Sequence, residues 1–256
     1  MRLPSVTTAC PFGRYLAVIL VLTLGACVRS RSVHDLHVPS GAAAQSSAGP
    51  TVVIEAVDAR AFEAKPDKAD VPSLKYAEEI TKSEITSRAY GRKRGSFGGA
   101  KGDFVMPEGR SVPQLVTEVV GQALSQRGYK VVGPQDPAAA SASKVKVTIE
   151  QFWSYLRPGF FVVAVDFVAR LRIEGDMVGS SGPLLVEGKD QMRRMMLTEG
   201  RWIGLVERGL GGLSTAVAEK LPTVGGVATA AAGETATTAE PLAGGTPAPA
   251  ATPATP

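Results

Sequence analysis

Histidine and cysteine are scarce in this sequence, and their scarcity excludes most common active sites. The chain has two histidines, His34 and His37, and two cysteines, Cys10 and Cys27. It also lacks the Gly-x-Ser-x-Gly motif that surrounds the nucleophile of many hydrolases. A hydrolase needs a nucleophile, a base and a group that orients the base. Because both histidines precede the predicted folded domain, we expect that the protein is not an enzyme.

Groups that bind metals or transfer protons are also too few. The pair His34-x-x-His37, with Asp35 between them, offers few ligands in a segment that we expect to be flexible. Glu187 and Asp190 are the best acid pair, but their positions on a predicted strand place both toward solvent. We therefore expect no metal site and no cofactor.

The N-terminus carries the most specific motif of the sequence. An apolar run from Tyr15 to Leu24 follows two arginines and is too short for a stable membrane span. It ends in Leu-Gly-Ala-Cys, which resembles the lipobox of bacterial lipoproteins. We predict that residues 1–26 are a lipoprotein signal peptide and that Cys27 is acylated, which anchors the protein in a membrane. The alternative is an ordinary signal peptide that happens to precede a cysteine.

Removal of the signal peptide also determines which cysteines and which charges the mature chain contains. Cys10 lies in the removed segment, so no disulfide is available and the core must stabilise the fold. Val28, rather than aspartate, after the lipidated cysteine favours the outer membrane, facing the periplasm. Of 28 basic and 24 acidic residues, two arginines are lost, which leaves 26 against 24, or +2. This charge is too small to indicate a nucleic-acid partner.

The remaining chain divides into three segments by composition. Residues 27–50 are small and polar, which predicts a flexible tether from the lipid. Residues 222–256 are almost entirely Ala, Thr, Gly and Pro, which predicts a disordered tail. Residues 51–221 are long enough for one domain with its own core.

Hydrophobic periodicity predicts the elements of this domain. Ser111 caps a helix that has Pro113 in its first turn and ends at Gly128. Alternation on the strand after residue 143 places Trp153 and Tyr155 on one face with Val145, Val147 and Ile149. The predicted order is β-α-β-β-β-β-α, from a strand at 51–58 to a helix at 199–220. This order predicts an α+β domain whose largely antiparallel sheet carries two helices on one face.

A glycine-rich basic segment, RKRGSFGGAKGD from Arg92 to Asp103, approaches the phosphate-binding loop pattern. Lys101 has the correct offset, but Ala100 replaces a required glycine and Gly102 replaces the hydroxyl that binds Mg²⁺. No helix follows directly, and a periplasmic domain meets no cytoplasmic ATP. We therefore expect no nucleotide partner.

The same segment is a candidate site for polyanions. Five basic residues occur before the first acidic one at Asp103, and we expect them on a flexible loop: Arg88, Arg92, Lys93, Arg94 and Lys101. They could bind anionic lipid headgroups or a cell-wall polymer. The alternative is an ordinary solvated surface.

Three further features have a structural and a functional interpretation. Asp58 and Arg60 lie on one face at a strand end, where we expect an exposed ion pair of small energetic value. Trp153 is expected in the core. Trp202 and the Phe160–Phe161 pair are expected either in the core or on a surface that binds a partner.

These elements together resemble the YajG-type family of bacterial lipoproteins. The resemblance covers most of residues 51–221 and rests on the following features: Cys27, Asp58 and Arg60 after the first strand, the loop at Tyr90–Gly91, the helix ending at Gly128–Tyr129, Trp153, the strand 161–173 and the helix 199–220. A charged insertion at 61–85 and the tail depart from the pattern. The resemblance implies an envelope lipoprotein with no known catalytic residues. The element order is also similar, at fold level, to auxiliary lipoproteins of envelope assembly and lipid transport.

Two functions follow from this sequence. The first is a non-catalytic adaptor or structural subunit of an envelope complex, which binds a protein partner through a sheet edge or an apolar patch. The second is a binding module for anionic headgroups or a cell-wall polymer through the basic loop 88–102.

Overall fold

The computed structural model describes residues 31–39, 49–95, 99–159, 162–176 and 182–224. Cys27, the Phe160–Phe161 pair and the tail from residue 225 lie outside these ranges. The described elements form one α+β domain, as predicted: β1 (Arg31–Val33), β2 (Thr51–Asp58), α2 (Ser83–Thr86), β3 (Ala89–Arg94), β4 (Ala100–Val105), α3 (Val112–Gln126), β5 (Lys130–Val132), β6 (Ser143–Pro158), β7 (Val163–Gly175), β8 (Leu184–Arg194) and α4 (Glu199–Lys220). The predicted order β-α-β-β-β-β-α is present as β2-α3-β5-β6-β7-β8-α4.

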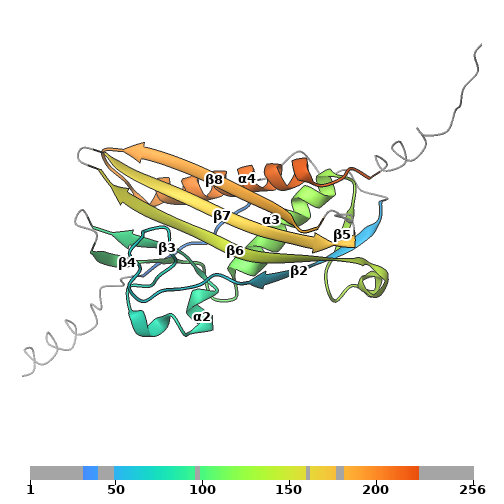
Figure 1. Ribbon diagram of the computed structural model, residues 1–256, viewed down its shortest axis with the longest axis horizontal. Coiled ribbons are helices and arrows are strands. Elements are labelled where there is room, and N and C mark those ends of the chain that lie inside the picture. Colours follow the sequence, from blue (N-terminus) through green and yellow to red (C-terminus); the bar gives the residue numbers. More distant parts are fainter. Residues whose placement is uncertain (1–30, 40–48, 96–98, 160–161, 177–181, 225–256) are drawn as a thin grey trace, which may run out of the picture. The chain divides into compact units, whose positions relative to one another are not determined.

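The long strand β6 organises the sheet of eight strands. Along one edge it pairs with β7 in antiparallel fashion, and β7 pairs with β8 in the same way. Along the other edge β6 pairs in parallel first with β2 and then, near its end, with β3. Strand β5 extends the sheet beyond β2, while β4 and β1 extend it beyond β3. Figure 1 shows β6, β7 and β8 as long neighbouring arrows, with α3 and α4 behind them.

Helix α3 begins and ends where its sequence predicts. Ser111 forms a capping box with Gln114, in which each side chain bonds the backbone N–H of the other. Pro113 lies in the first turn, where no intrahelical donor is lost. Gly128 ends the helix with φ +91°, a left-handed conformation that suits glycine.

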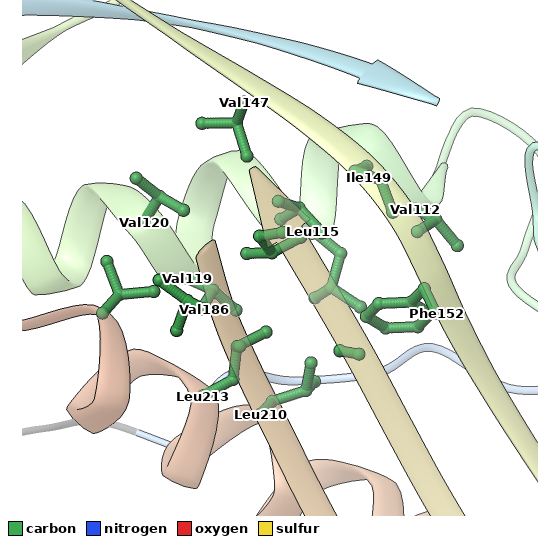
Figure 2. Packing of buried hydrophobic residues seen from close by; sticks show 14 of the residues in the cluster. Val112, Leu115, Val119, Val120, Val147, Ile149, Phe152, Val186, Leu210 and Leu213 are labelled. Carbon is green, nitrogen blue, oxygen red and sulfur yellow. The ribbon is translucent and has the colours of Figure 1, made fainter. Parts of the chain in front are cut away.

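The main core lies between helices α3 and α4 on one side and the sheet on the other. Figure 2 shows its packed side chains, which come from α3, α4, β6 and β8: Val112, Leu115, Val119, Val120, Val147, Ile149, Phe152, Val186, Leu210 and Leu213. Helix α4 packs closely on the sheet at Gly209, where an added Cβ would lie 2.3 Å from the Phe167 ring. A larger residue at this position would push α4 away from β7.

A β-bulge on β6 corrects one predicted face. Ile149 and Gln151 pair with consecutive residues of β7, so Glu150 is an extra residue on β6. The bulge reverses the alternation beyond it. Phe152 therefore faces the helices, while Trp153 lies buried on the opposite face with Tyr155 packed nearby. The prediction that Trp153 is a core residue is confirmed, but the predicted face was wrong.

The predicted insertion supplies the cover for that opposite face. Leu74, Ala89, Val105 and Trp153 form a second, smaller core there. Phe62 contacts the Trp153 ring edge-to-face, at 5.8 Å between centroids and an interplanar angle of 82°. The segment between β2 and β3 is therefore a structural layer of the domain.

Part of the predicted tether also belongs to the domain. Strand β1 pairs in parallel with β4, and Leu36 is fully buried in the main core. The Gln122 side chain of α3 donates to the Pro39 carbonyl at 3.0 Å. The prediction of a flexible segment up to residue 50 was therefore wrong for residues 31–39. A three-residue strand and one buried leucine leave no periodic pattern in the sequence.

Candidate functional site

The predicted basic loop is largely a β-hairpin of β3 and β4. Arg92 pairs with Asp103 and Lys93 with Gly102 across this hairpin. A phosphate-binding loop instead connects a strand to the N-terminus of a helix. Lys101 lies within β4, so the near-match to that motif does not have the corresponding geometry.

Two of the five predicted basic residues have structural contacts away from the hairpin tip. Arg88 Nε donates to the Met106 carbonyl at 2.9 Å, just before β3. Arg92 is buried, and its Nη1 donates to Ser73 Oγ at 2.9 Å beneath the covering layer. Burial lowers the pKa of Arg92. Neither residue therefore belongs to an open basic surface.

The other three line a hollow of about 300 Å³ beside the start of α4. Lys93, Arg94 and Lys101 form one wall, and Leu197 and Trp202 contribute apolar surface. The structure therefore brings together three of the five predicted polyanion residues, on a shaped surface next to a helix that is distant in the sequence.

Trp202 is a core residue that also lines this hollow. It is almost fully buried, and its Nε1 donates to Ser154 Oγ at 2.8 Å. The centroid of its ring lies 4.9 Å from that of the Phe104 ring. Of the two interpretations of Trp202, the structure supports the core.

Glu199, the first residue of α4, connects the hairpin, the helix and the N-terminal strand. Its carboxylate pairs with Lys93 Nζ, accepts from Ser32 Oγ at 2.9 Å and lies 3.1 Å from His34 Nε2. These contacts, Lys93 first, lower the pKa of Glu199 to about 2. A carboxylate at a helix N-terminus is also favoured by the helix dipole. The cluster holds β1 against the start of α4.

A second hollow, of about 540 Å³, also borders the start of α4. Four arginines from β8 and α4 line it: Arg193, Arg194, Arg201 and Arg208. Arg208 pairs with Asp190 at 3.2 Å, and the remaining three are exposed. The sequence carries one local signal for this site, the adjacent Arg193–Arg194 pair, which lies outside the predicted basic loop. The turn after β8 brings these two arginines next to Arg201 and Arg208 of α4.

That turn exposes two large apolar side chains. Met195 and Met196 are each 79% exposed, more than the other large apolar residues found exposed in the described chain. In the sequence they directly follow Arg193 and Arg194, which line the second hollow, and precede Glu199, which lines the first. We call the surface formed by Arg94, Lys101, Arg193, Arg194 and Arg201, with this methionine pair, the basic end.

The residues considered for metal binding or proton transfer do not converge. Each side chain lies beside a separate acidic or basic side chain: His34 beside Glu199, Asp35 beside Arg110, His37 beside Glu207, Glu187 beside Arg170 and Asp190 beside Arg208. Within the part of the chain that the structure describes, no group of three or more histidine, cysteine or acidic residues is placed to hold a metal ion.

Asp58 and Arg60 form the expected ion pair, but it is not exposed. The Arg60 side chain is fully buried and binds Asp58 through Nε and Nη2, at 2.8 and 2.7 Å. It also donates to the carbonyls of Thr86, Ala89 and Phe152, at 2.8, 2.6 and 3.2 Å. Arg60 thus joins β2 to β3, β6 and α2, which is a structural role.

Comparison with known proteins gives only distant similarities. No family model and no curated protein matches the sequence. Among solved structures, an uncharacterized protein aligns over 74% of this chain and 96% of its own, at 10% identity and a TM-score of 0.41. A Xanthomonas campestris protein of the DUF330 family aligns over 73% of this chain and 92% of its own, at the same identity and TM-score. None of these comparisons confirms the YajG-type family, which stays a prediction.

Of the helices that the structure describes, none is long and apolar enough to cross a bilayer.

Proposed function

We propose that this protein is a membrane-anchored lipoprotein of the bacterial envelope that acts without catalysis, as an adaptor or auxiliary subunit of an envelope complex. One observation carries the proposal: the lipobox cysteine, Cys27, lies four residues before Arg31, where β1 begins. Four extended residues reach about 14 Å. A lipid on Cys27 would therefore hold the domain at the membrane surface.

The way in which β1 is bound supports this proposal. Pairing with β4, the contacts of Ser32 and His34 with Glu199, and the burial of Leu36 all fix the N-terminal segment to the domain. The anchor would thus act on the folded domain through a short link. A short link limits the positions of the domain relative to the membrane, as an adaptor requires.

Strand β8 offers a surface for a protein partner. Within the described residues it pairs with β7 alone, over eleven residues, so no strand pairs with its other edge there. The Leu185 carbonyl accepts from Lys220 Nζ at 2.5 Å, and an added strand would have to replace this bond. Leu185, near its beginning, is a large apolar residue exposed to solvent. An extended segment of a partner could pair with this edge and cover Leu185.

Membrane anchorage is tested by fractionating cells that express the wild-type protein or Cys27→Ala. We expect the processed wild-type protein in the membrane fraction, released by detergent but not by salt. We expect Cys27→Ala to lose this detergent-dependent anchorage. A variant from which residues 1–26 have been removed, and which still resists release by high salt, would refute the lipoprotein proposal.

Partner binding is tested with a photo-crosslinking residue at position 185 in living cells. The adaptor proposal predicts one discrete adduct with another envelope protein at Leu185. The matched control is position 55, where Glu55 is exposed on β2. The adaptor proposal fails if both positions give the same adducts.

A second function, binding of anionic headgroups or a cell-wall polymer, is supported by the hollow that Lys93, Arg94 and Lys101 line. Because such binding would be ionic, it should weaken steeply as the salt concentration rises. Vesicle binding that does not change between low and high salt would argue against it.

A further inference from the structure

The basic end combines positive charge with exposed apolar side chains at the start of α4. We propose that this surface rests on an anionic lipid bilayer, with lipid phosphates bound by the arginines and the Met195–Met196 turn in the headgroup region. The inference rests on the proposed lipidation of Cys27. It names the surface of the domain that faces the membrane.

The charges of the arginine-lined hollow favour an anionic occupant. Arg193, Arg194 and Arg201 are exposed around it, and the nearby Asp190 is paired with Arg208. The planar guanidinium group matches two phosphate oxygens at once. Each basic residue close to an anionic membrane surface strengthens binding about fivefold. Several together therefore produce a strong preference for anionic lipid.

The methionine turn supplies the apolar part of the contact. Met195 and Met196 follow directly on Arg193 and Arg194, so apolar and cationic side chains share one turn. Long, unbranched thioether side chains adapt to irregular surroundings. Apolar side chains beside cations are typical of segments that lie at the boundary of headgroups and acyl chains.

The length of the N-terminal link places this turn near the anchor. Ser32 Oγ donates to Glu199 at 2.9 Å, and Cys27 lies five residues before Ser32. Cys27 is therefore within about 18 Å of Ser32, whose side chain contacts the first residue of α4. The opposite end of β8, at Leu185, is about 30 Å farther along the strand. Figure 1 shows that the β8 arrowhead and the first turn of α4 lie at the same end of the sheet.

The inference is tested with an environment-sensitive fluorophore on a cysteine at position 195. The full chain is produced with its own signal peptide, so Met195→Cys provides the reactive thiol while Cys27 is acylated and Cys10 is removed. The protein is reconstituted on vesicles of phosphatidylglycerol with phosphatidylethanolamine. We expect a blue-shifted emission that headgroup-attached spin labels quench. The matched control is Leu185→Cys, an exposed position at the other end of β8, where we expect neither effect.

Charge reversal tests the role of the arginines. In the Met195→Cys background, we combine Arg193→Glu, Arg194→Glu and Arg201→Glu. The ratio of proteins whose basic end is bound to the membrane to those whose basic end is free should fall by at least about 100-fold, since three attractions of about fivefold each are lost and repulsion is added. The quenching at position 195 should then disappear, while the acyl chains keep the protein on the vesicles. The control reverses three exposed lysines away from this surface: Lys130→Glu, Lys144→Glu and Lys146→Glu. This control should keep the quenching.

The outcomes separate the inference from the proposed function. If the protein floats with the vesicles but the probe at position 195 stays in water, the inference is overturned and lipidation stands. Equal quenching on phosphatidylcholine vesicles would overturn the recognition of anionic lipid. If the wild-type protein does not float with vesicles at all, the lipoprotein proposal is overturned, and the inference with it.

Discussion

Replacing Arg60 by alanine should destabilise the domain far more than the loss of a surface ion pair. The side chain is fully buried and donates to the carbonyls of Thr86, Ala89 and Phe152 as well as to Asp58. Its removal leaves these carbonyls without their donor and leaves a carboxylate that is only 22% exposed. Breaking a buried ion pair on one side costs about 3–5 kcal/mol. Because water can reach Asp58, we expect about 3 kcal/mol.

The free energy of unfolding of Arg60→Ala is measured by urea denaturation, followed by tryptophan fluorescence. Trp153 reports on the small core beside Arg60, and Trp202 on the main core. The matched control is Arg170→Ala, which removes an ion pair with Glu187 whose side chains are 54% and 37% exposed. We expect this control to cost at most about 1 kcal/mol. Equal losses for the two variants would refute the structural role of Arg60.

Two further predictions concern α4. Gly209→Ala should lower the free energy of unfolding by about 1–3 kcal/mol, because the new Cβ would collide with Phe167. Gly212→Ala should raise it by about 0.5–1 kcal/mol, because no atom lies within 4 Å of an added Cβ there and alanine favours the helix. Opposite shifts of the urea midpoint test this pair. Glu199 has a pKa lowered from 4.5 to about 2, so its hold on β1 is complete above pH 4.5 and is lost as the pH falls toward 2. In the wild-type protein, hydrogen exchange at the Ser32 amide, corrected for intrinsic rates, should become faster as the pH falls from 4.5 toward 2. In Glu199→Gln the contact with β1 is already weakened, so exchange should not become faster over this pH range. A rise of equal size in the two proteins would contradict this role of Glu199.

The regular elements of the fold were predictable because local patterns encode them. The cap at Ser111, the stop at Gly128 and the alternation along β7 each act within a few residues of sequence. The bulge at Glu150 was not predictable in this way. One extra residue reverses the face of Trp153, and its place depends on pairing with β7, which is distant in sequence.

The candidate site was predictable only in part, because it is assembled from distant segments. Lys93, Arg94 and Lys101 were selected for their charge, and the hairpin brings them to the start of α4. The same criterion selected Arg92, which the covering layer buries. Charge in a sequence does not show which side of a strand is covered. The arginine hollow depends on the approach of β8 to α4, which no local pattern encodes.

The chemical state of Cys27 tests the central claim most directly. The measurement is the intact mass of the wild-type protein extracted from the membrane fraction with detergent. Lipidation predicts a chain that begins at Cys27 and carries the additional mass of acyl groups on that residue. A mature chain that begins elsewhere, or that begins at Cys27 with an unmodified thiol, would contradict the account.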